Sequence, residues 1–325
     1  MARILITGVS GQDGGILAEQ AAVDGHEVHG LVHGGDLEIM RLRERYPGLV
    51  LHEGDLTDWS SLQRLMESVE PDEVYNLAGV SSVAQSWAEP LLTADVTGMG
   101  VARLMDAVWQ HAERAARPVR VLQASSAEIF GEPVKAPQNE STPIRPTSPY
   151  GAAKAFAHHI VGVYRERGLH AVSVILYNHE SPGRPTTFVT RKITRGVAEI
   201  ALGRAAELVL GNLDARRDWG WAPDYVDAMR RALSHPDPDD YVVATGRDRS
   251  VRDFVAAAFS RVDIDRWEEL VRVDPALLRR ADPSLLVGDA RKARHRLGWA
   301  PTVPFDEVVG RMVDADLAEL AGARE

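Results

Sequence analysis

Short apolar runs alternate with longer segments of helical periodicity through the first half of the chain. The apolar runs have the length of buried strands, and the segments between them repeat apolar residues every three or four positions. This alternation predicts a Rossmann-type α/β fold, a doubly wound parallel sheet covered by helices on both faces. The predicted strands include residues 3–7, 26–32, 73–78, 119–124 and 171–177, and the predicted helices cover residues 14–23, 37–45, 60–68, 91–114 and 148–167.

The alternation weakens after Asn178, where loops rich in proline, glycine and arginine separate the periodic segments. We expect residues 1–177 to form a dinucleotide-binding domain. Residues 178–325 should form a smaller, mostly helical substrate lobe, with part of the chain crossing back to the first domain. The elements expected there are helices at 189–202, after Pro223, at 251–261 and at 305–320, and strands at 207–210 and 241–244. The run 235–240 consists of turn formers and predicts a solvated turn.

Composition narrows the class of protein. The 325 residues include 45% apolar and 26% charged residues, as in ordinary globular proteins, and carry a net charge of -10. This charge argues against binding to nucleic acid or to an anionic membrane, and no apolar run is long enough to span a bilayer. The absence of cysteine excludes disulfides, thiolate zinc sites and cysteine nucleophiles, and we expect no metal site. The start of the sequence lacks a signal-peptide layout, which favours a cytoplasmic enzyme.

The first candidate site is a glycine-rich turn between a predicted strand and a predicted helix. Gly8, Gly11 and Gly14 would let the backbone approach a pyrophosphate at the helix N-terminus, although a structural turn would use the same residues. The loops that follow the third and fourth strands would touch the adenine and ribose of the same dinucleotide. The cofactor candidates in these loops are Asp55, Leu56, Leu77, Ala78, Gly79 and Ser81.

The end of the second strand leaves the form of the cofactor open. An acidic residue there favours a free adenosine 2′-hydroxyl, and an arginine favours a 2′-phosphate. This chain has Val32-His33-Gly34-Gly35-Asp36. His33 is either a phosphate contact or a surface loop histidine, and Asp36 is either a ribose ligand or, more in keeping with its position, the N-cap of the next helix.

The second candidate site contains side chains suited to acid–base catalysis. Tyr150 and Lys154 are four residues apart and share one face of a helix that begins after Ser148. An ammonium at that spacing is expected to lower the pKa of the phenol and let it act as a base. Ser126 would donate to the same reacting oxygen. Glu128 adds a carboxylate that plain hydride transfer does not need, although its spacing alone equally fits an exposed loop carboxylate.

At these residues the chain resembles the extended short-chain dehydrogenase/reductases, and within them the GDP-mannose 4,6-dehydratase family. The resemblance covers nearly the whole chain, from the turn with Gln12 and Asp13 to the segment around Asp289. The matching segments are 8–14, 123–131, 178–182, 188–193, 211–214, 217–220, 273–275, 279 and 286–289.

The resemblance implies a role for each matching position. Catalytic roles fall to Ser126, Glu128, Tyr150 and Lys154. Cofactor contacts beyond those already given fall to Gln12, Asp13, Tyr150, Lys154, His179 and Arg184. The nucleotide sugar would be held by Ser81, Ser126, Glu128, Asn178, Glu180, Val189, Lys192, Arg217 and Arg279. Planar guanidinium groups suit a diphosphate, although Arg217 and Arg279 would also fit surface ion pairs.

The implied reaction is that of a hydro-lyase converting GDP-D-mannose to GDP-4-keto-6-deoxy-D-mannose with a recycled nicotinamide cofactor. The resemblance favours NADP(H), while the missing arginine loop after Val32 leaves NAD(H) open. The resemblance implies a tetramer, but the same loop, which helps neighbouring subunits pair in the family, is shorter here, so we expect a homodimer with a tetramer as the alternative. The rival predictions are a reductase or epimerase of the same superfamily acting on another nucleotide sugar, and a non-catalytic nucleotide-binding protein. The complete set of Ser126, Tyr150 and Lys154 argues against the second.

Overall fold

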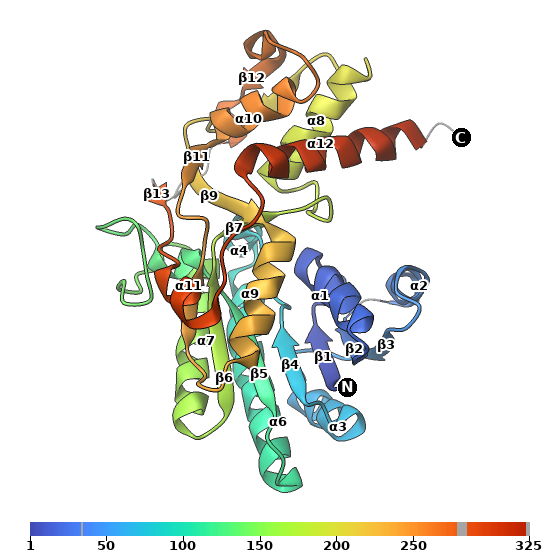
Figure 1. The fold of residues 1–325 in the computed structure, drawn as a ribbon, viewed down its shortest axis with the longest axis vertical. Coiled ribbons are helices and arrows are strands. Elements are labelled where there is room, and N and C mark those ends of the chain that lie inside the picture. The colour runs from blue at the N-terminus through green and yellow to red at the C-terminus, as the bar shows by residue number, and fades with distance from the viewer. Residues whose placement is uncertain (34, 278–284, 323–325) are drawn as a thin grey trace.

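Six strands from residues 1–176 and one from residues 240–243 build a seven-stranded sheet in which every pairing is parallel. The computed structural model describes residues 1–33, 35–277 and 285–322 (Figure 1). The strand order is β10-β6-β5-β4-β1-β2-β3, which reverses direction next to β1 as in a doubly wound fold. The strands are β1 (Arg3–Thr7), β2 (Glu27–Val32), β3 (Val50–Glu53), β4 (Glu73–Asn76), β5 (Arg120–Ser126), β6 (His170–Leu176) and β10 (Asp240–Val243). The predicted fold class is confirmed.

Helices cover both faces of this sheet, so each face has its own apolar core. One core joins the sheet to α3, α6 and α7, and the other joins it to α1, α2, α9 and α11. Their bounds are α1 (Gln12–Val23), α2 (Asp36–Arg45), α3 (Trp59–Val69), α6 (Gly100–Ala115), α7 (Pro149–Glu166), α9 (Ala222–Ser234) and α11 (Arg291–Leu297). Except for β3 at the sheet edge, which is partly exposed, the strands are largely buried on both sides, which explains why they read as nearly continuous apolar runs.

Side chains at the helix starts explain several boundaries. Asp58 accepts from the backbone N–H groups of the first turn of α3, and Ser148 does the same for α7, where Pro149 takes the first helical position. The helix predicted at 91–114 is continuous but irregular: α5 (Pro90–Thr93) leads through a π-helical stretch, η1 (Ala94–Met99), into α6. The prediction for Asp36 as an N-cap is wrong, because α2 begins at Asp36 and Gly35 occupies the N-cap.

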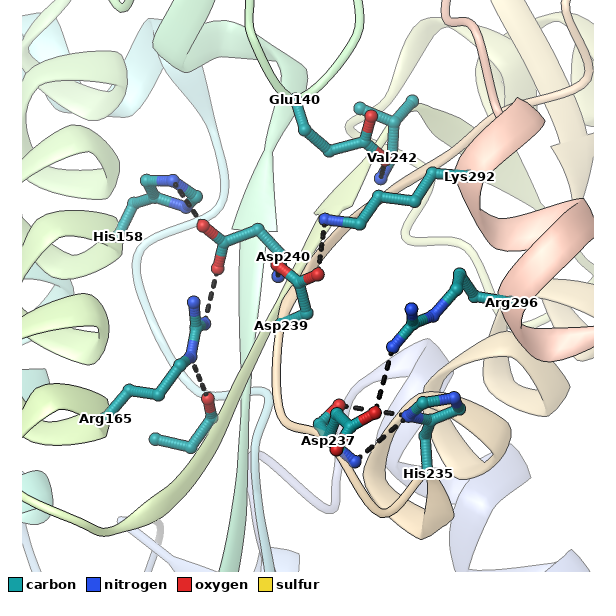
Figure 2. Close-up of polar contacts among 11 residues, drawn as sticks. Glu140, His158, Arg165, His235, Asp237, Asp239, Asp240, Val242, Lys292 and Arg296 are labelled. Atoms are coloured by element: carbon teal, nitrogen blue, oxygen red, sulfur yellow. Dashed lines mark hydrogen bonds and ion pairs between the residues drawn. The ribbon is translucent and has the colours of Figure 1, made fainter.

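The chain returns to the large sheet after entering the second lobe. β10 pairs with β6 at the edge, and α9 packs against α1 on one face of the sheet. Figure 2 shows how charged side chains anchor the returning strand. Asp240 accepts from Arg165 of α7 at 2.5 Å and lies 3.6 Å from His158, while Lys292 of α11 lies 2.7 Å from Asp239. The predicted turn covers residues 235–239, because Asp240 already begins β10, and the carboxylates of Asp239 and Asp240 are held by neighbouring helices.

The second lobe combines three helices with short strands. The helices are α8 (Val189–Ala201), α10 (Val251–Ser260) and α12 (Phe305–Gly322), which enclose a third apolar core (Figure 1). β9 (Arg216–Trp221) pairs with β7 (Asn178–Glu180), β11 (Asp248–Ser250) and β13 (Leu285–Leu286), and β8 (Leu208–Leu210) pairs with β12 (Val271–Val273). The remaining short elements are α4 (Val83–Ala88), η2 (Ala127–Phe130), η3 (Trp267–Leu270) and η4 (Pro275–Leu277). Among the described helices, none has the length and apolar character needed to cross a membrane.

Candidate active site

A cavity of about 370 Å³ lies where the carboxyl ends of β5 and β6 face the second lobe. Its walls come from both halves of the chain, because parallel strands place their carboxyl ends at one edge and β7 and β9 close over that edge. The cavity brings together most of the predicted catalytic and substrate residues. Those that line it are Asp13, Leu77, Ser81, Ser126, Glu128, Tyr150, Lys154, Asn178, His179, Glu180, Arg184, Val189, Lys192 and Arg217.

The other predicted cofactor residues lie outside this cavity. His33 and Asp55 line a separate hollow at the ends of β2 and β3. The side chain of Leu56 is buried in the apolar core below α6, so only its backbone is available to a ligand. Ala78 follows β4 and its N–H lies 3.3 Å from the hydroxyl of Thr7. Arg279 lies outside the described residues.

Two glycines of the turn after β1 are required by close backbone contacts. Gly8 has φ +71°, and a Cβ there would lie 2.8 Å from the carbonyl carbon of Leu77. A Cβ on Gly14 would lie 2.3 Å from the carbonyl oxygen of Gly8. A side chain on Gly8 would push the turn away from the segment after β4, and one on Gly14 would push α1 away from the turn. The N-terminus of α1 therefore opens onto a surface made of backbone, which is the form a pyrophosphate site needs.

The phenol of Tyr150 is buried beside Ser126 and Glu128. Burial raises its pKa to about 12, the charge of Glu128 acts in the same direction, and the hydrogen bond with Ser126 opposes the rise. The pKa lowering expected from Lys154 is therefore wrong for the protein without bound ligand, because the loss of solvent outweighs the favourable contacts. Further positive charge in the cavity would lower the pKa of the phenol again.

Lys154 is held by the backbone of β5. Its Nζ donates to the carbonyl oxygen of Ala124 at 2.7 Å and lies 5.9 Å from the centre of the Tyr150 ring. Burial lowers the pKa of Lys154 to about 8, and the charge of Asp13 partly opposes this shift. Two of the three ammonium protons remain available to other acceptors, so a ligand oxygen in the cavity can bind to the same group.

A buried ion pair links the start of α1 to β7. His179 Nε2 lies 2.8 Å from Asp13, its Nδ1 lies 2.7 Å from the carbonyl oxygen of Tyr177, and its ring stacks on Tyr225 with centroids 4.6 Å apart. Burial is the largest single effect and disfavours both charges, but the mutual attraction and the hydrogen bonds together outweigh it, so the pKa of His179 is raised and that of Asp13 is lowered. With two acceptors facing the two nitrogens, the imidazolium form fits the site.

We expect His179→Gln to lower the free energy of unfolding by about 3 kcal/mol, because it leaves the Asp13 carboxylate buried without its partner. The pKa of His179 is raised in the folded protein. Its contribution to the free energy of unfolding is therefore full below the ordinary pKa of 6.5 and is lost as pH rises through the pKa of the folded protein. The pKa of Asp13 is lowered in the folded protein. Its contribution to the free energy of unfolding is therefore present above the ordinary pKa of 3.8 and is lost as pH falls through the pKa of the folded protein. Urea unfolding over a pH series should show the largest difference between 3.8 and 6.5.

The exposed His159 on α7 provides the control, since His159→Gln removes an imidazole without a buried partner. If His179→Gln lowered the free energy of unfolding by the same amount at every pH, the effect would come from lost packing against Tyr225 and not from the ion pair.

Glu180 and Arg184 form a second pair in the wall of the cavity. The Glu180 side chain is buried and accepts from the hydroxyl of Thr190 at 2.7 Å, and Arg184 Nε lies 3.4 Å from the same carboxyl group. The guanidinium also lies 3.9 Å from the centre of the Phe188 ring. Thr190 and Phe188 were not predicted as site residues. Their position at the start of α8, within a segment that matches the family, is the signal that points to them.

Arg217 lies on the central strand of the small sheet and is buried. One of its guanidinium nitrogens donates to the carbonyl oxygen of Arg216 at 2.7 Å. Burial argues against the alternative of a surface ion pair. Lys154, His179, Arg184, Lys192 and Arg217 together line one cavity in a protein of net charge -10, which is the local concentration of positive charge that a diphosphate requires.

A nicotinamide dinucleotide fits these residues. The backbone surface at Gly8 and Gly14 suits its pyrophosphate, and the cavity next to it contains Tyr150 and Lys154. Ser125 also lines the cavity, and its buried hydroxyl has no hydrogen-bond partner within the described part of the protein. A polar ligand would satisfy this hydroxyl. No group of His, Asp and Glu side chains within the described residues has the arrangement of a metal site.

Comparison with known proteins agrees with this geometry. The family model for GDP-mannose 4,6 dehydratase matches residues 5–312. GDP-mannose 4,6 dehydratase 1 of Arabidopsis thaliana is 45% identical over 98% of this chain and 90% of its own length. The human GDP-mannose 4,6 dehydratase is 43% identical over 96% of this chain and 91% of its own length. The crystal structure of Thermus thermophilus UDP-glucose 4-epimerase with NAD is 28% identical, with a TM-score of 0.83 over 97% of this chain and 98% of that one.

The doubly wound sheet, the Tyr150/Lys154 pair and the likeness to this solved structure define an extended short-chain dehydrogenase/reductase. Within that class, the chain belongs to the GDP-mannose 4,6-dehydratase family.

Proposed function

We propose that this protein is a hydro-lyase that converts GDP-D-mannose to GDP-4-keto-6-deoxy-D-mannose and water. The observation that carries the proposal is the presence of Glu128 in the same cavity as Ser126, Tyr150 and Lys154, within a chain of this family. The other three residues suffice for oxidation and reduction at a carbinol carbon. A carboxylate beside them supplies the acid–base group that elimination needs.

The chain's residues divide the proton transfers of the reaction between Tyr150 and Glu128. Ser126 orients the C4 hydroxyl of the hexose, and Tyr150 removes its proton while Lys154 stabilises the phenolate. The nicotinamide supplies a reversible hydride acceptor, so that C4 is oxidised, C6 is reduced, and no cofactor is consumed. The C4 ketone acidifies C5–H, and Glu128 removes that proton. Glu128 then protonates the C6 hydroxyl, which leaves as water. When C6 is reduced, the proton that Tyr150 took from the C4 hydroxyl passes to C5, directly or through water, and both side chains return to their starting forms.

The positively charged residues hold the nucleotide. Arg217 and Lys192 would neutralise the diphosphate, with Arg279 as a further predicted contact, and Asn178, Glu180 and Val189 would shape the sugar site. His179 and Asp13 would fix the cofactor side of the cavity by joining α1 to β7. The cofactor is a nicotinamide dinucleotide. The resemblance favours NADP(H), whereas the charges at the adenosine end favour NAD(H).

The test is to incubate the purified protein with GDP-mannose and a catalytic amount of nicotinamide dinucleotide, then follow the sugar nucleotide by mass spectrometry. The expected result is loss of one water with no net change in the redox state of the cofactor. Stoichiometric consumption of reduced cofactor would identify a reductase, and an isomeric product of unchanged mass would identify an epimerase.

We also propose that the protein forms a homodimer. Its cytoplasmic location stays a prediction. Exposed apolar side chains gather on α4, α5, η1 and α7, which pack against one another. They are Trp87, Leu91, Leu92, Met99, Phe156 and Val163, with exposed fractions from 41% to 84%. A second copy of the same face would cover them with matching apolar surface.

The double variant Leu91→Glu/Phe156→Glu should therefore be a monomer in light scattering, because charges in the centre of an apolar interface are left without solvent. Val23→Glu is the matched control, since Val23 is 86% exposed on α1, away from this face. A dimer that survives the double change would exclude this face as the interface.

A further inference from the structure

A second hollow lies at the carboxyl ends of β2 and β3. It is lined by Val32, His33, Glu53, Gly54, Asp55, Asp58 and Ser61. β1, β2 and β3 are adjacent parallel strands, so this hollow and the glycine turn open at the same edge of the sheet. A dinucleotide whose pyrophosphate lies on Gly8 and Gly14 extends its adenosine in this direction.

The hollow is acidic. Asp55 accepts from the N–H of Thr57 at 2.7 Å. Burial opposes its ionisation, but the hydrogen bonds from Thr57 and the nearby positive charge outweigh burial, so the pKa of Asp55 is lowered. The Asp58 carboxylate is fixed at the start of α3, where it accepts from two backbone N–H groups. With Glu53, three carboxyl groups line this small surface.

Compensating cations are scarce around it. Within the described residues the hollow has no lysine or arginine in its lining. Arg64 lies outside it, 3.8 Å from the Asp58 carboxylate with which it is paired, and is 69% exposed. Arg103, whose charge reaches Asp55, donates to Asp95 at 2.8 Å. His33 lies 3.5 Å from Asp55 and is 81% exposed, so its nearest charged neighbour is a carboxylate.

On the basis of the dehydratase function proposed above, we propose that this hollow makes the enzyme select NAD(H) over NADP(H). In this fold the carboxylate that accepts from a free ribose 2′-hydroxyl stands at the end of the second strand. Here His33 occupies that position, and Asp55, from the loop after the neighbouring strand β3, lies 3.5 Å from it and supplies the carboxylate. A 2′-phosphate would bring about two negative charges against three carboxylates, without the bidentate guanidinium that phosphate recognition uses. The residues that determine the selectivity are Asp55, Asp58 and Glu53.

The first test measures binding of each dinucleotide to the intact protein by calorimetry, without substrate. NAD⁺ is expected to bind at least about tenfold more tightly than NADP⁺, and the difference should shrink as salt is raised, since it is electrostatic. Equal binding, or tighter binding of NADP⁺, overturns the selectivity while leaving the dehydratase proposal standing. Failure of both dinucleotides to bind overturns both proposals.

A second test changes the charge without touching the carboxylates. Gly35 is at the N-cap of α2 with φ −76°, and a Cβ there meets no atom within 4 Å, so Gly35→Arg fits the fold. It should tighten NADP⁺ binding about tenfold or more. Gly48→Arg is the control, because Gly48 is equally open and follows the far end of α2. The same change in both variants would reveal a non-local charge effect and contradict the assignment to this hollow.

Discussion

Replacing Glu128 with glutamine is expected to stop dehydration while leaving the protein folded and able to bind dinucleotide. Glutamine keeps the shape of the side chain, and the backbone N–H of residue 128 still donates to Ser126 Oγ, which fixes the local turn. The amide can neither remove the C5 proton nor protonate the leaving hydroxyl. Because general acid–base groups contribute about 10²–10⁴ in rate and Glu128 serves twice, we expect kcat to fall by about 10³ or more.

Glu132→Gln is the matched control for this variant. Glu132 lies four residues later, is exposed, and does not line the cavity. The measurement is product formation by mass spectrometry, together with the incorporation of solvent deuterium at C5. Product formation at the normal rate in Glu128→Gln would remove Glu128 from the mechanism and return the reductase and epimerase to consideration.

Tyr150→Phe is expected to abolish the reaction at an earlier step. The buried ring remains packed in α7, but the group that accepts the C4 proton is gone, so the C4 ketone does not form and C5–H is never acidified. We expect a loss of about 10²–10⁴ in kcat.

The two variants can be separated with the finished 4-keto product in deuterated water. Tyr150→Phe should still exchange the C5 hydrogen of this compound, because its C4 is already oxidised, whereas Glu128→Gln should not. Exchange lost in both variants, or in neither, would contradict the division of labour between the two side chains.

The sequence predicted those features that depend on local pattern. The buried strands are nearly continuous apolar runs, and Ser148-Pro149 marks the start of α7, so the shared face of Tyr150 and Lys154 followed directly. The gathering of the catalytic and substrate residues in one cavity followed from the rule that ligands bind at the carboxyl ends of parallel strands. The precise role of each residue rests on the family resemblance.

Features that depend on tertiary contact were not predictable. The short strands of the small sheet have two to six residues and carry too little pattern to be recognised. The pairing of His179 with Asp13 joins residues 166 positions apart. The sign of the Tyr150 pKa shift was wrong, because spacing reveals a neighbouring ammonium but not the depth of burial that outweighs it.

The return of the chain to the large sheet affects the order in which this protein can fold during synthesis. β6 leaves the ribosome long before β10, its partner at the sheet edge, and α9 also follows the first strands of the second lobe. Until residue 243 has emerged, one edge of the sheet stays unpaired and the face beneath α9 stays exposed, and both invite association with other chains. A fragment ending at residue 177 should therefore require chaperones, although it contains the whole glycine turn and the Tyr150/Lys154 pair.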